Sequence, residues 1–209
     1  MSIDLYTGTT GSGKSLHAAS DIREYLNARR RDIPVIANFR LSPDAPVIKP
    51  YNFHHIPNED MTAGRLIDFA TDFWDNSGMR FREDYIQLYL DEAQLLFNSR
   101  RWSDRSRMQY LEFLSQSRKY GYHVVLITQS AKMIDNQFRM LVDVEHNHRR
   151  VSRMGLVGAL VSLPFAGRLF LVVRYLFQVN ERLGMDMRIF RRCDGAMYDS
   201  YATFQRQDK

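Results

Sequence analysis

Cysteine is almost absent from this sequence, because Cys193 is the only one among 209 residues. One cysteine excludes an intrachain disulfide, and therefore excludes the small secreted domains that disulfides hold together. Residues 3–7 already have the pattern of a strand, so we expect no signal peptide before them. We therefore expect a protein of a reducing compartment, the cytoplasm.

Long apolar runs are absent too. The uncharged run from Met154 to Gly167 ends at Arg168, short of the ~18 to 20 residues that cross a bilayer, so no transmembrane helix is predicted. The sequence also lacks Asn-Lys-x-Asp, which weighs against a GTPase. Excess charge is small: a net charge of +5 and a pI near 9.4 allow an anionic partner without indicating one.

The composition is that of a globular protein, with 44% hydrophobic and 25% charged residues. Expected strands and helices alternate along the chain, which is typical of a three-layer α/β domain with a mainly parallel sheet. Strands are predicted at 3–7, 35–39 and 123–129, helices at 14–30, 62–77 and 105–121, and a strand running into a helix at Glu92 over 85–97.

The last quarter of the chain differs from the rest. A basic run at 146–153 precedes an apolar stretch at 154–177. The tail at 186–204 has the pattern of two strands joined at the turn dipeptide Asp194-Gly195.

We therefore expect a core at 1–150, with 151–209 closing the same domain through a hydrophobic hairpin and added strands. The apolar stretch favours a core hairpin or a subunit contact, and a membrane-surface role is the alternative.

The segment Gly8-Thr-Thr-Gly-Ser-Gly-Lys14-Ser15 matches the phosphate-binding pattern G-x-x-x-x-G-K-[ST], between an expected strand and an expected helix. Small residues let the backbone N–H groups wrap a phosphate, and a helix N-terminus favours an anion. A chance match is the alternative, at about one in a hundred for a chain of this size. Lys14 is predicted to contact the β- and γ-phosphates and Ser15 to ligate Mg²⁺. The predicted ATP-binding residues are Gly8, Thr9, Thr10, Gly11, Ser12, Gly13, Lys14, Ser15 and Leu16.

An apolar strand ending in Asp91 and Glu92 supplies the second half of the expected site. Asp91 is predicted to hold the Mg²⁺ shell at the carboxyl edge of the sheet, where ligands of α/β proteins bind. Glu92 is predicted to polarise a water for attack on the γ-phosphate. The alternative is an acidic helix N-terminus stabilised by the helix dipole, but the upstream phosphate loop favours catalysis.

Two further positions have candidate catalytic roles. Gln129 ends an apolar strand and could sense the γ-phosphate, with a simple strand terminator as an equal alternative. Arg118 is a candidate arginine finger for a neighbouring subunit, and Arg139 is the second candidate. An arginine on a helix surface is more often solvated or paired.

Other polar clusters support weaker predictions. Four arginines could line a DNA-facing surface of a ring or, more simply, form a solvated helix face. They are Arg100, Arg101, Arg105 and Arg107. His146 and His148 have no Cys or carboxylate partner at metal-ligand spacing, so no metal site is predicted there.

In these motifs the chain resembles the zonular occludens toxin (Zot) family of P-loop ATPases, which is similar to filamentous-phage assembly proteins. The segments that carry the resemblance follow the family's order along the chain: YTGTTGSGKSLHA, VIANF, YLDEAQLLFNSRRW, FLSQSRKYGYHVVLITQSAKMIDNQFR, HNHRRVSR and YDSYATF. The resemblance implies a RecA-like fold of the FtsK/HerA-type group with sheet order 5-1-4-3-2. The HVVLIT strand would then lie between the phosphate-loop and Asp-Glu strands.

The resemblance also implies roles for individual residues. Residues 8–15 correspond to a Walker A loop, and Asp91 and Glu92 to a Walker B pair. Gln129 corresponds to a polar sensor, and Arg118 to the arginine that related translocases present to the next subunit.

The expected function is a Mg²⁺-dependent ATP-hydrolysing motor, working as a homo-oligomeric ring in phage assembly, export or DNA translocation. A ring would supply Arg118, since one subunit alone is expected to lack a complete charge clamp. Phage coat protein and DNA are the expected partners.

The expected location is the cytoplasmic face of the host membrane. Many relatives carry a membrane span beyond this region, whereas this sequence ends at Lys209 without one. We therefore expect docking through a partner membrane protein or through residues 155–173 at the membrane surface. Two rival functions are a membrane-docked nucleotide switch with little turnover and a small-molecule kinase.

Overall fold

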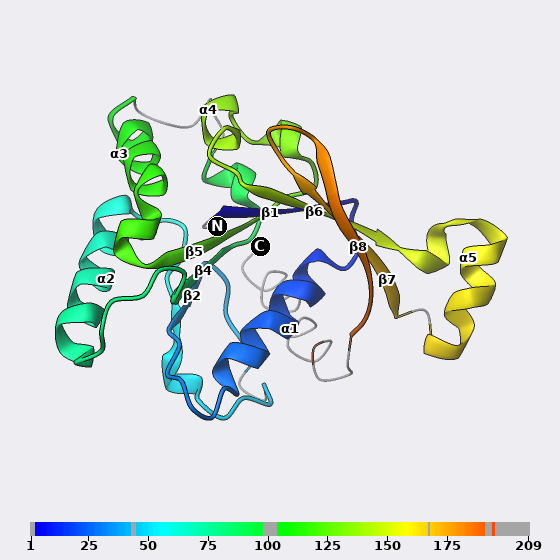
Figure 1. Cartoon of the computed structure of the whole chain (residues 1–209), viewed down its shortest axis with the longest axis horizontal. Helices are drawn as coiled ribbons and strands as arrows, with labels where there is room; N and C mark the ends of the chain where they lie inside the picture. The colour runs from blue at the N-terminus through cyan, green and yellow to red at the C-terminus, as the bar shows by residue number, and fades with distance from the viewer. Residues whose placement is uncertain (1–2, 43–44, 98–103, 167, 191–193, 195–209) are drawn as a thin grey trace.

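The computed structural model describes residues 3–42, 45–97, 104–166, 168–190 and 194, and Figure 1 shows a large sheet with helices packed along it. The sheet has eight strands in the order β3-β2-β4-β5-β1-β6-β7-β8. They are β1 (Ile3–Thr7), β2 (Val35–Ala37), β3 (Phe53–His55), β4 (Ile86–Leu90), β5 (Tyr122–Ile127), β6 (Val144–Arg150), β7 (Leu169–Leu176) and β8 (Glu181–Ile189).

The middle of the sheet has the topology that the family resemblance implies. From β6 through β1, β5 and β4 to β2, neighbouring strands are parallel and follow the order 5-1-4-3-2. β5 lies between β1 and β4, so this prediction is confirmed. Because the strands are parallel, the carboxyl ends of β1, β4 and β5 meet at one edge of the sheet, where the predicted motifs follow them.

Helices cover both faces of the sheet, which confirms the three-layer α/β architecture. The α-helices are α1 (Lys14–Leu26), α2 (Ala63–Ser77), α3 (Asp104–Ser115), α4 (Asn136–Arg139) and α5 (Gly155–Ser162). α1 packs through residues such as Ile22 and Leu26 on one face. α2 and α3 pack through Leu66 and Phe113 on the other.

Short 3-10 turns connect several of these elements. They are η1 (Pro50–Asn52), η2 (Ala93–Leu95), η3 (Ser117–Tyr120), η4 (Ala131–Met133), η5 (Val151–Arg153) and η6 (Leu163–Phe165). The helix predicted over 105–121 is therefore α3 followed by η3, and Gly121, with φ of 82°, ends it as expected. The helix predicted to begin at Glu92 is the single turn η2.

The C-terminal quarter differs from the prediction. Residues 154–165 fold mainly as α5 and η6 rather than as one arm of a hairpin, because the stretch has no turn dipeptide before Pro164. The hairpin forms instead between β7 and β8, which extend the sheet in antiparallel fashion beside β6. Gly195 and the second strand predicted in the tail lie outside the described residues. In the described part of the chain, no helix is long and apolar enough to cross a membrane.

Candidate nucleotide-binding site

The phosphate loop joins β1 to α1 at the carboxyl edge of the sheet. Three of its glycines have positive φ, 140° at Gly8, 74° at Gly11 and 101° at Gly13, which residues with a side chain rarely adopt. α1 begins at Lys14 directly after them, so its N-terminal N–H groups lie beside the loop. The local sequence therefore forms the glycine loop and helix N-terminus that its pattern predicts, a geometry suited to an anion.

Residues of β6, η5 and β7 pack against this loop and form a hydrogen bond to its backbone. A Cβ at Gly13 would lie 2.5 Å from Cδ1 of Phe170 in β7, and one at Gly8 would lie 2.4 Å from a backbone carbonyl of β6. Arg153 Nη1 donates to the Thr10 carbonyl at 2.8 Å. Since neither glycine has room for a side chain, both serve the packing of the loop as well as its conformation.

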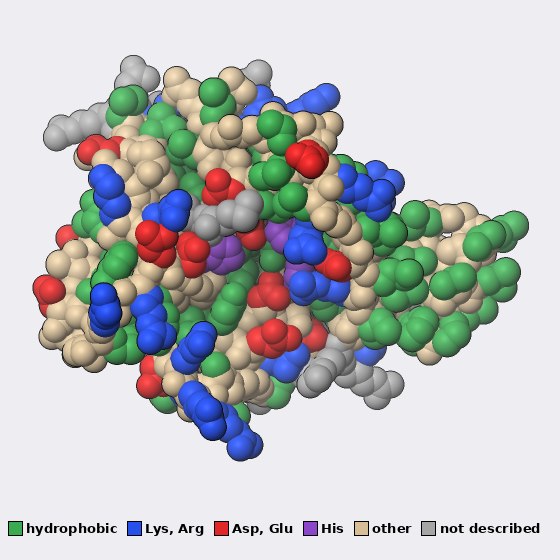
Figure 2. Space-filling model, in the orientation of Figure 1, with side chains coloured by type: hydrophobic (Ala, Val, Ile, Leu, Met, Phe, Trp, Pro, Cys, Tyr) green, Lys and Arg blue, Asp and Glu red, His purple; other side chains and the backbone are tan. Residues whose placement is uncertain are grey.

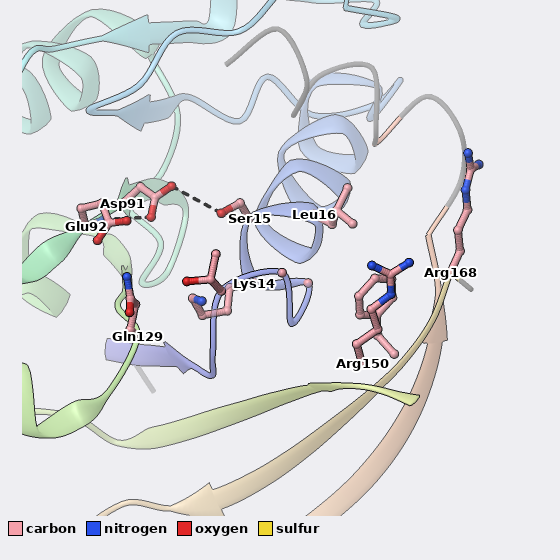
Figure 3. A pocket seen from close by; sticks show the side chains of 12 residues that line it. Lys14, Ser15, Leu16, Asp91, Glu92, Gln129, Arg150 and Arg168 are labelled. Atoms are coloured by element: carbon pink, nitrogen blue, oxygen red, sulfur yellow. Dashed lines mark hydrogen bonds between the residues drawn. The ribbon is translucent and has the colours of Figure 1, made fainter. Parts of the chain in front are cut away.

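Lys14, Ser15 and Asp91 meet at the centre of the site (Figure 3). Ser15 Oγ donates to Asp91 Oδ2 at 3.4 Å, and Lys14 Nζ donates to the Gly8 carbonyl at 2.7 Å. Burial lowers the pKa of Lys14, an effect that the carboxylates of Asp91 and Glu92 partly offset. A hydroxyl and a carboxylate oxygen at this separation are hard oxygen donors of the kind Mg²⁺ prefers. The residues present therefore fit the predicted metal site.

Asn38, which follows β2, fixes the backbone of Asp91. Its Nδ2 donates to the Asp91 carbonyl at 2.8 Å, and its Oδ1 accepts from the Asp91 N–H at 2.8 Å. These two bonds continue the pairing of β2 with β4 beyond the end of both strands. Asn38 had no predicted role, although it is the polar residue within the apolar segment VIANF.

Glu92 has a left-handed backbone conformation, with φ of 48°, which costs a residue other than glycine about 1 kcal/mol or more. Its carboxylate accepts a hydrogen bond from Nε2 of Gln94. Gln94 Oε1 accepts in turn from Thr128 Oγ1 at 2.8 Å. Gln94 thus links the predicted catalytic carboxylate to the residue after β5. Gln94 was not predicted to belong to the site, although it lies only two residues after Glu92.

The two motifs and Gln129 line one cavity of about 260 Å³. Asp91, Glu92 and Gln129 lie at one end, and Arg150 and Arg168 lie at the other, with the phosphate loop between them (Figure 3). Gln129 follows β5, which lies between β1 and β4, and it lines the cavity together with both motifs. Its role as a sensor stays a prediction.

Two arginines of this chain reach the cavity without having been predicted. Arg150 ends β6 and Arg168 precedes β7, and the Arg150 guanidinium lies 5.9 Å from the centre of the Phe170 ring. The pairing of β6 with β7 brings both arginines beside the loop. Both arginines add positive charge from the same chain to the cavity, while the completion of the site by a neighbouring subunit stays a prediction. In the sequence, the basic run at 146–153 was the feature that could have indicated Arg150.

Arg118 lies at the opposite edge of the sheet from the phosphate loop. It belongs to η3, before the amino end of β5, whereas the loop follows the carboxyl end of the parallel neighbour β1. Arg118 is exposed and pairs with Glu83 at 2.6 Å. Arg139 Nη2 donates to Asn136 Oδ1 at 2.9 Å. Neither arginine lines the cavity of its own chain, and their action on a neighbouring subunit stays a prediction.

Within the predicted arginine cluster, Arg107 has a structural partner. Its Nη2 pairs with Asp135 Oδ1 at 3.0 Å, and Asp135 also caps α4, so the ion pair ties α3 to the start of α4. Arg100 and Arg101 lie outside the described residues, as does the side chain of Arg105. The predicted DNA-facing surface therefore has no support from Arg107.

A buried histidine pair lies behind the phosphate loop. Nδ1 of His17, in α1, lies 2.7 Å from Nε2 of His148, in β6. Nδ1 of His148 donates to the carbonyls of Thr7 and His146, at 3.2 and 2.8 Å. Nε2 of His148 therefore accepts from the Nδ1–H of His17. Burial lowers the pKa of His148 to about 3 and lowers the pKa of His17 further, so two neutral imidazoles tie α1 to β6.

Comparison with known proteins places this site in a family. A sequence profile described as zonular occludens toxin (Zot) matches residues 2–169, which include the phosphate loop and the Asp-Glu pair. The chain belongs to the Zot family. This confirms the resemblance that the sequence motifs indicate.

This Zot-family chain is similar to phage proteins named Gene 1 protein. The protein of Enterobacteria phage I2-2 is 29% identical over 225 residues, covering 98% of this chain and 57% of the relative. The protein of Enterobacteria phage fd is 26% identical over 186 residues, covering 83% of this chain and 47% of the relative. The chain therefore spans about half the length of these relatives.

Solved structures confirm the fold of the Zot-family chain. It is similar to the N-terminal domain of zonular occludens toxin from Neisseria meningitidis, with a TM-score of 0.57, 17% identity and coverage of 96% of this chain and 98% of the other. It is also similar to B204, the DNA-packaging ATPase from Sulfolobus Turreted Icosahedral Virus, with a TM-score of 0.55, 16% identity and coverage of 90% and 96%. At these identities the likeness establishes a shared fold.

Proposed function

We propose that the chain is a Mg²⁺-dependent ATPase and the motor of phage assembly, export or DNA translocation at the cytoplasmic face of the host membrane. The observation that carries the proposal is the 3.4 Å approach of Ser15 Oγ to Asp91 Oδ2 in a cavity that Lys14, Glu92 and Gln129 also line. These are the residue types that P-loop enzymes use for phosphoryl transfer. A B204 structure with a TM-score of 0.51 is described as a genome packaging NTPase in complex with ATP-γS, which supports a nucleotide ligand.

The two ends of the cavity give the proposed orientation of ATP. The γ-phosphate would lie toward Glu92 and Gln129, because a general base has to be within reach of the attacking water. The ribose and base would then lie toward Arg150 and Arg168, at the other end of the cavity (Figure 3).

Each residue then has a defined task in hydrolysis. Lys14 would neutralise charge on the β- and γ-phosphates, and Glu92 would accept the proton of the attacking water. Ser15 and Asp91 would hold Mg²⁺, which offsets phosphate charge when bound. Gln94, through its hydrogen bond, would orient the Glu92 carboxylate.

We propose a homo-oligomer as the working form, with phage coat protein or DNA as the cargo. Two findings support this. The relatives are proteins of phages, and the structural relative B204 is described as a DNA-packaging ATPase. A ring is a closed arrangement of identical subunits, and it would let several copies act in turn on one polymer.

A nucleotide switch with little turnover is the second candidate. One observation favours it, namely that the Glu92 carboxylate is already engaged by Gln94. A switch would bind ATP through the same loop but would not release phosphate at a useful rate.

Binding and phosphate release measured on the same samples test the proposal. The wild type should bind ATP and release inorganic phosphate, and Lys14→Ala should bind ATP about 10- to 100-fold more weakly, because one charge-assisted hydrogen bond is lost. Lys119→Ala is the matched control, since Lys119 is exposed in η3.

Three results would contradict the proposal. Unchanged ATP binding by Lys14→Ala would refute the site. ATP binding without phosphate release by the wild type would favour the switch. Transfer of the phosphoryl group to an added small molecule, in place of free phosphate, would indicate a kinase.

A further inference from the structure

α5 exposes its large apolar side chains to solvent. The exposed fractions are 85% for Leu156, 75% for Val157, 65% for Leu160 and 50% for Val161. Figure 1 shows α5 projecting from the body of the molecule, and Figure 2 shows hydrophobic side chains covering this projection. Since each such side chain gains about 1.5–3 kcal/mol when it is fully buried, exposure of four neighbours needs an explanation.

The way α5 is seated forces this exposure. Its buried residues are Gly158 and Ser162, one helical turn apart and therefore on one face. A Cβ at Gly158 would lie 2.3 Å from the Val151 carbonyl of η5. Ser162 Oγ donates to the Ala159 carbonyl of its own helix at 2.9 Å. The small residues thus face the protein and the large apolar ones face outward, the reverse of an ordinary surface helix.

The apolar surface continues past the end of α5. In η6, Leu163 is 69% exposed and Phe165 is 38% exposed, and before α5 Met154 is 46% exposed. We call residues 154–165 the apolar tip.

Positive charge flanks the apolar tip. Arg149, Arg153 and Arg168 are exposed on the segments that lead into and out of it, and the sequence has no Asp or Glu between Glu145 and Glu181. Arginines at the foot of an uncharged tip are complementary to a surface that has anionic groups outside and hydrocarbon inside.

We propose that the apolar tip inserts into the headgroup region of a bilayer that contains anionic lipids, while the flanking Arg149 and Arg153 contact lipid phosphates. An eight-residue helix is ~12 Å long, which suits entry into one leaflet rather than a span of the bilayer. A protein partner fits less well, because specific protein interfaces carry polar groups and hydrogen bonds around their apolar centre. The exposed side chains of α5 and η6 include none that form hydrogen bonds.

Docking in this orientation would place the phosphate loop close to the membrane. Arg153 precedes the tip and donates to Thr10 of the loop. Phe170 follows the tip and packs on Gly13. Both ends of the tip are therefore fixed to the nucleotide site.

Flotation of the full chain with lipid vesicles tests the proposal. The wild type should float with vesicles of phosphatidylcholine and phosphatidylglycerol, and less with phosphatidylcholine alone. The double variant Leu156→Glu, Leu160→Glu should bind to the vesicles at least about tenfold more weakly than the wild type, since it places two charges in the inserted face. Met108→Glu, at a 63% exposed position of α3, is the matched control and should float like the wild type.

Two further measurements keep the result interpretable. A thermal melt of the double variant should match that of the wild type, because both substituted positions are exposed. Lys14→Ala should float like the wild type, so vesicle binding is tested independently of ATP hydrolysis. Failure of the wild type to float, equal flotation with both lipid mixtures, or wild-type flotation of the double variant would overturn the proposal. A different result would also overturn it: the wild type does not bind vesicles and is an oligomer, and the double variant is a monomer. The tip would then contact a second copy of the chain rather than a bilayer.

Discussion

At the scale of single residues, Gln94 determines where the Glu92 carboxylate lies. Its amide nitrogen donates to Glu92, and its oxygen accepts from Thr128, so both hydrogen-bonding ends of one side chain are used. The arrangement couples the end of β4 to the end of β5, the two strands after which Glu92 and Gln129 lie. A general base held in this way keeps its orientation without the cost of ordering it in each cycle.

We expect Gln94→Leu to lower kcat about tenfold, because the leucine cannot hold the Glu92 carboxylate and small misplacements of a catalytic group are costly. The affinity for ATP should change little, since Gln94 is not among the residues that line the cavity. Phosphate release and ATP binding, measured side by side, separate the two effects. Thr128→Val should give a smaller loss in the same direction, and a loss of affinity in place of kcat would show that Gln94 has another role.

Arg168 lies at the opposite end of the cavity from Glu92 and leads to a different prediction. Arg168→Ala should weaken ATP and ADP binding by a similar factor, about tenfold, because both nucleotides share the groups at that end. Arg182→Ala, an exposed position of β8, is the control. Loss of ATP binding with unchanged ADP binding would place the γ-phosphate beside Arg168 and reverse the proposed orientation.

At the scale of elements, the phosphate loop was predictable because its signal is local. The glycines, Lys14 and the start of α1 are neighbours in sequence, and their spacing fixes their geometry. The contributions of Arg150, Arg168 and Phe170 were not predictable in this way. They depend on the antiparallel pairing of β6 with β7, which apolar periodicity does not specify.

We expect the contact between α1 and β6 to weaken in acid, because burial disfavours the charged forms of the two histidines that join them. The pKa of His148 is lowered to about 3, and burial also lowers the pKa of His17. Both histidines therefore bind fewer protons in the folded state below pH 6.5, and stability is lost as the pH falls below that value. Burial raises the pKa of Asp21 to about 6, which acts in the opposite direction between about pH 4 and 6. Two histidines outweigh one carboxyl group.

We expect the free energy of unfolding to fall by about 1 kcal/mol per pH unit between pH 6 and 5. His148→Asn keeps a donor for the carbonyls of β1 and β6 but removes one titrating imidazole. Its stability should therefore depend less on pH, although it is lower at pH 7. Urea denaturation at several pH values measures both slopes, and equal slopes would show that the histidine pair does not control acid stability.

At the scale of the whole molecule, the sheet gathers all the site residues on one edge and leaves Arg118 on the other. The order of the central strands was predictable, because the family resemblance covers the motifs that follow them. The place of α5 was not, since an apolar run of that length fits a hairpin arm or a helix equally well. The helix projects because Gly158 packs against η5 and because Pro164 lies in the turn η6 that ends the helix. Neither effect can be read from the apolar pattern.

The proposed ring predicts that turnover per subunit rises with protein concentration. Because Arg118 lies away from its own cavity, it could contribute to hydrolysis only in a neighbour, and Arg118→Ala should abolish the rise without weakening ATP binding. Arg149→Ala, an exposed arginine outside η3, is the control. A rate per subunit that is constant over a hundredfold range of concentration would show that each subunit is self-sufficient.

The assignment of this cavity as an ATPase site is tested most directly by phosphate release from the wild type and from Glu92→Gln, with ATP binding recorded on the same samples. Glu92 lines the cavity at the end away from Arg150 and Arg168 (Figure 3), and it is the proposed general base. We predict that Glu92→Gln binds ATP as the wild type does and releases phosphate about 10²- to 10⁴-fold more slowly. Equal rates for the two proteins would contradict the assignment of the site as an ATPase centre.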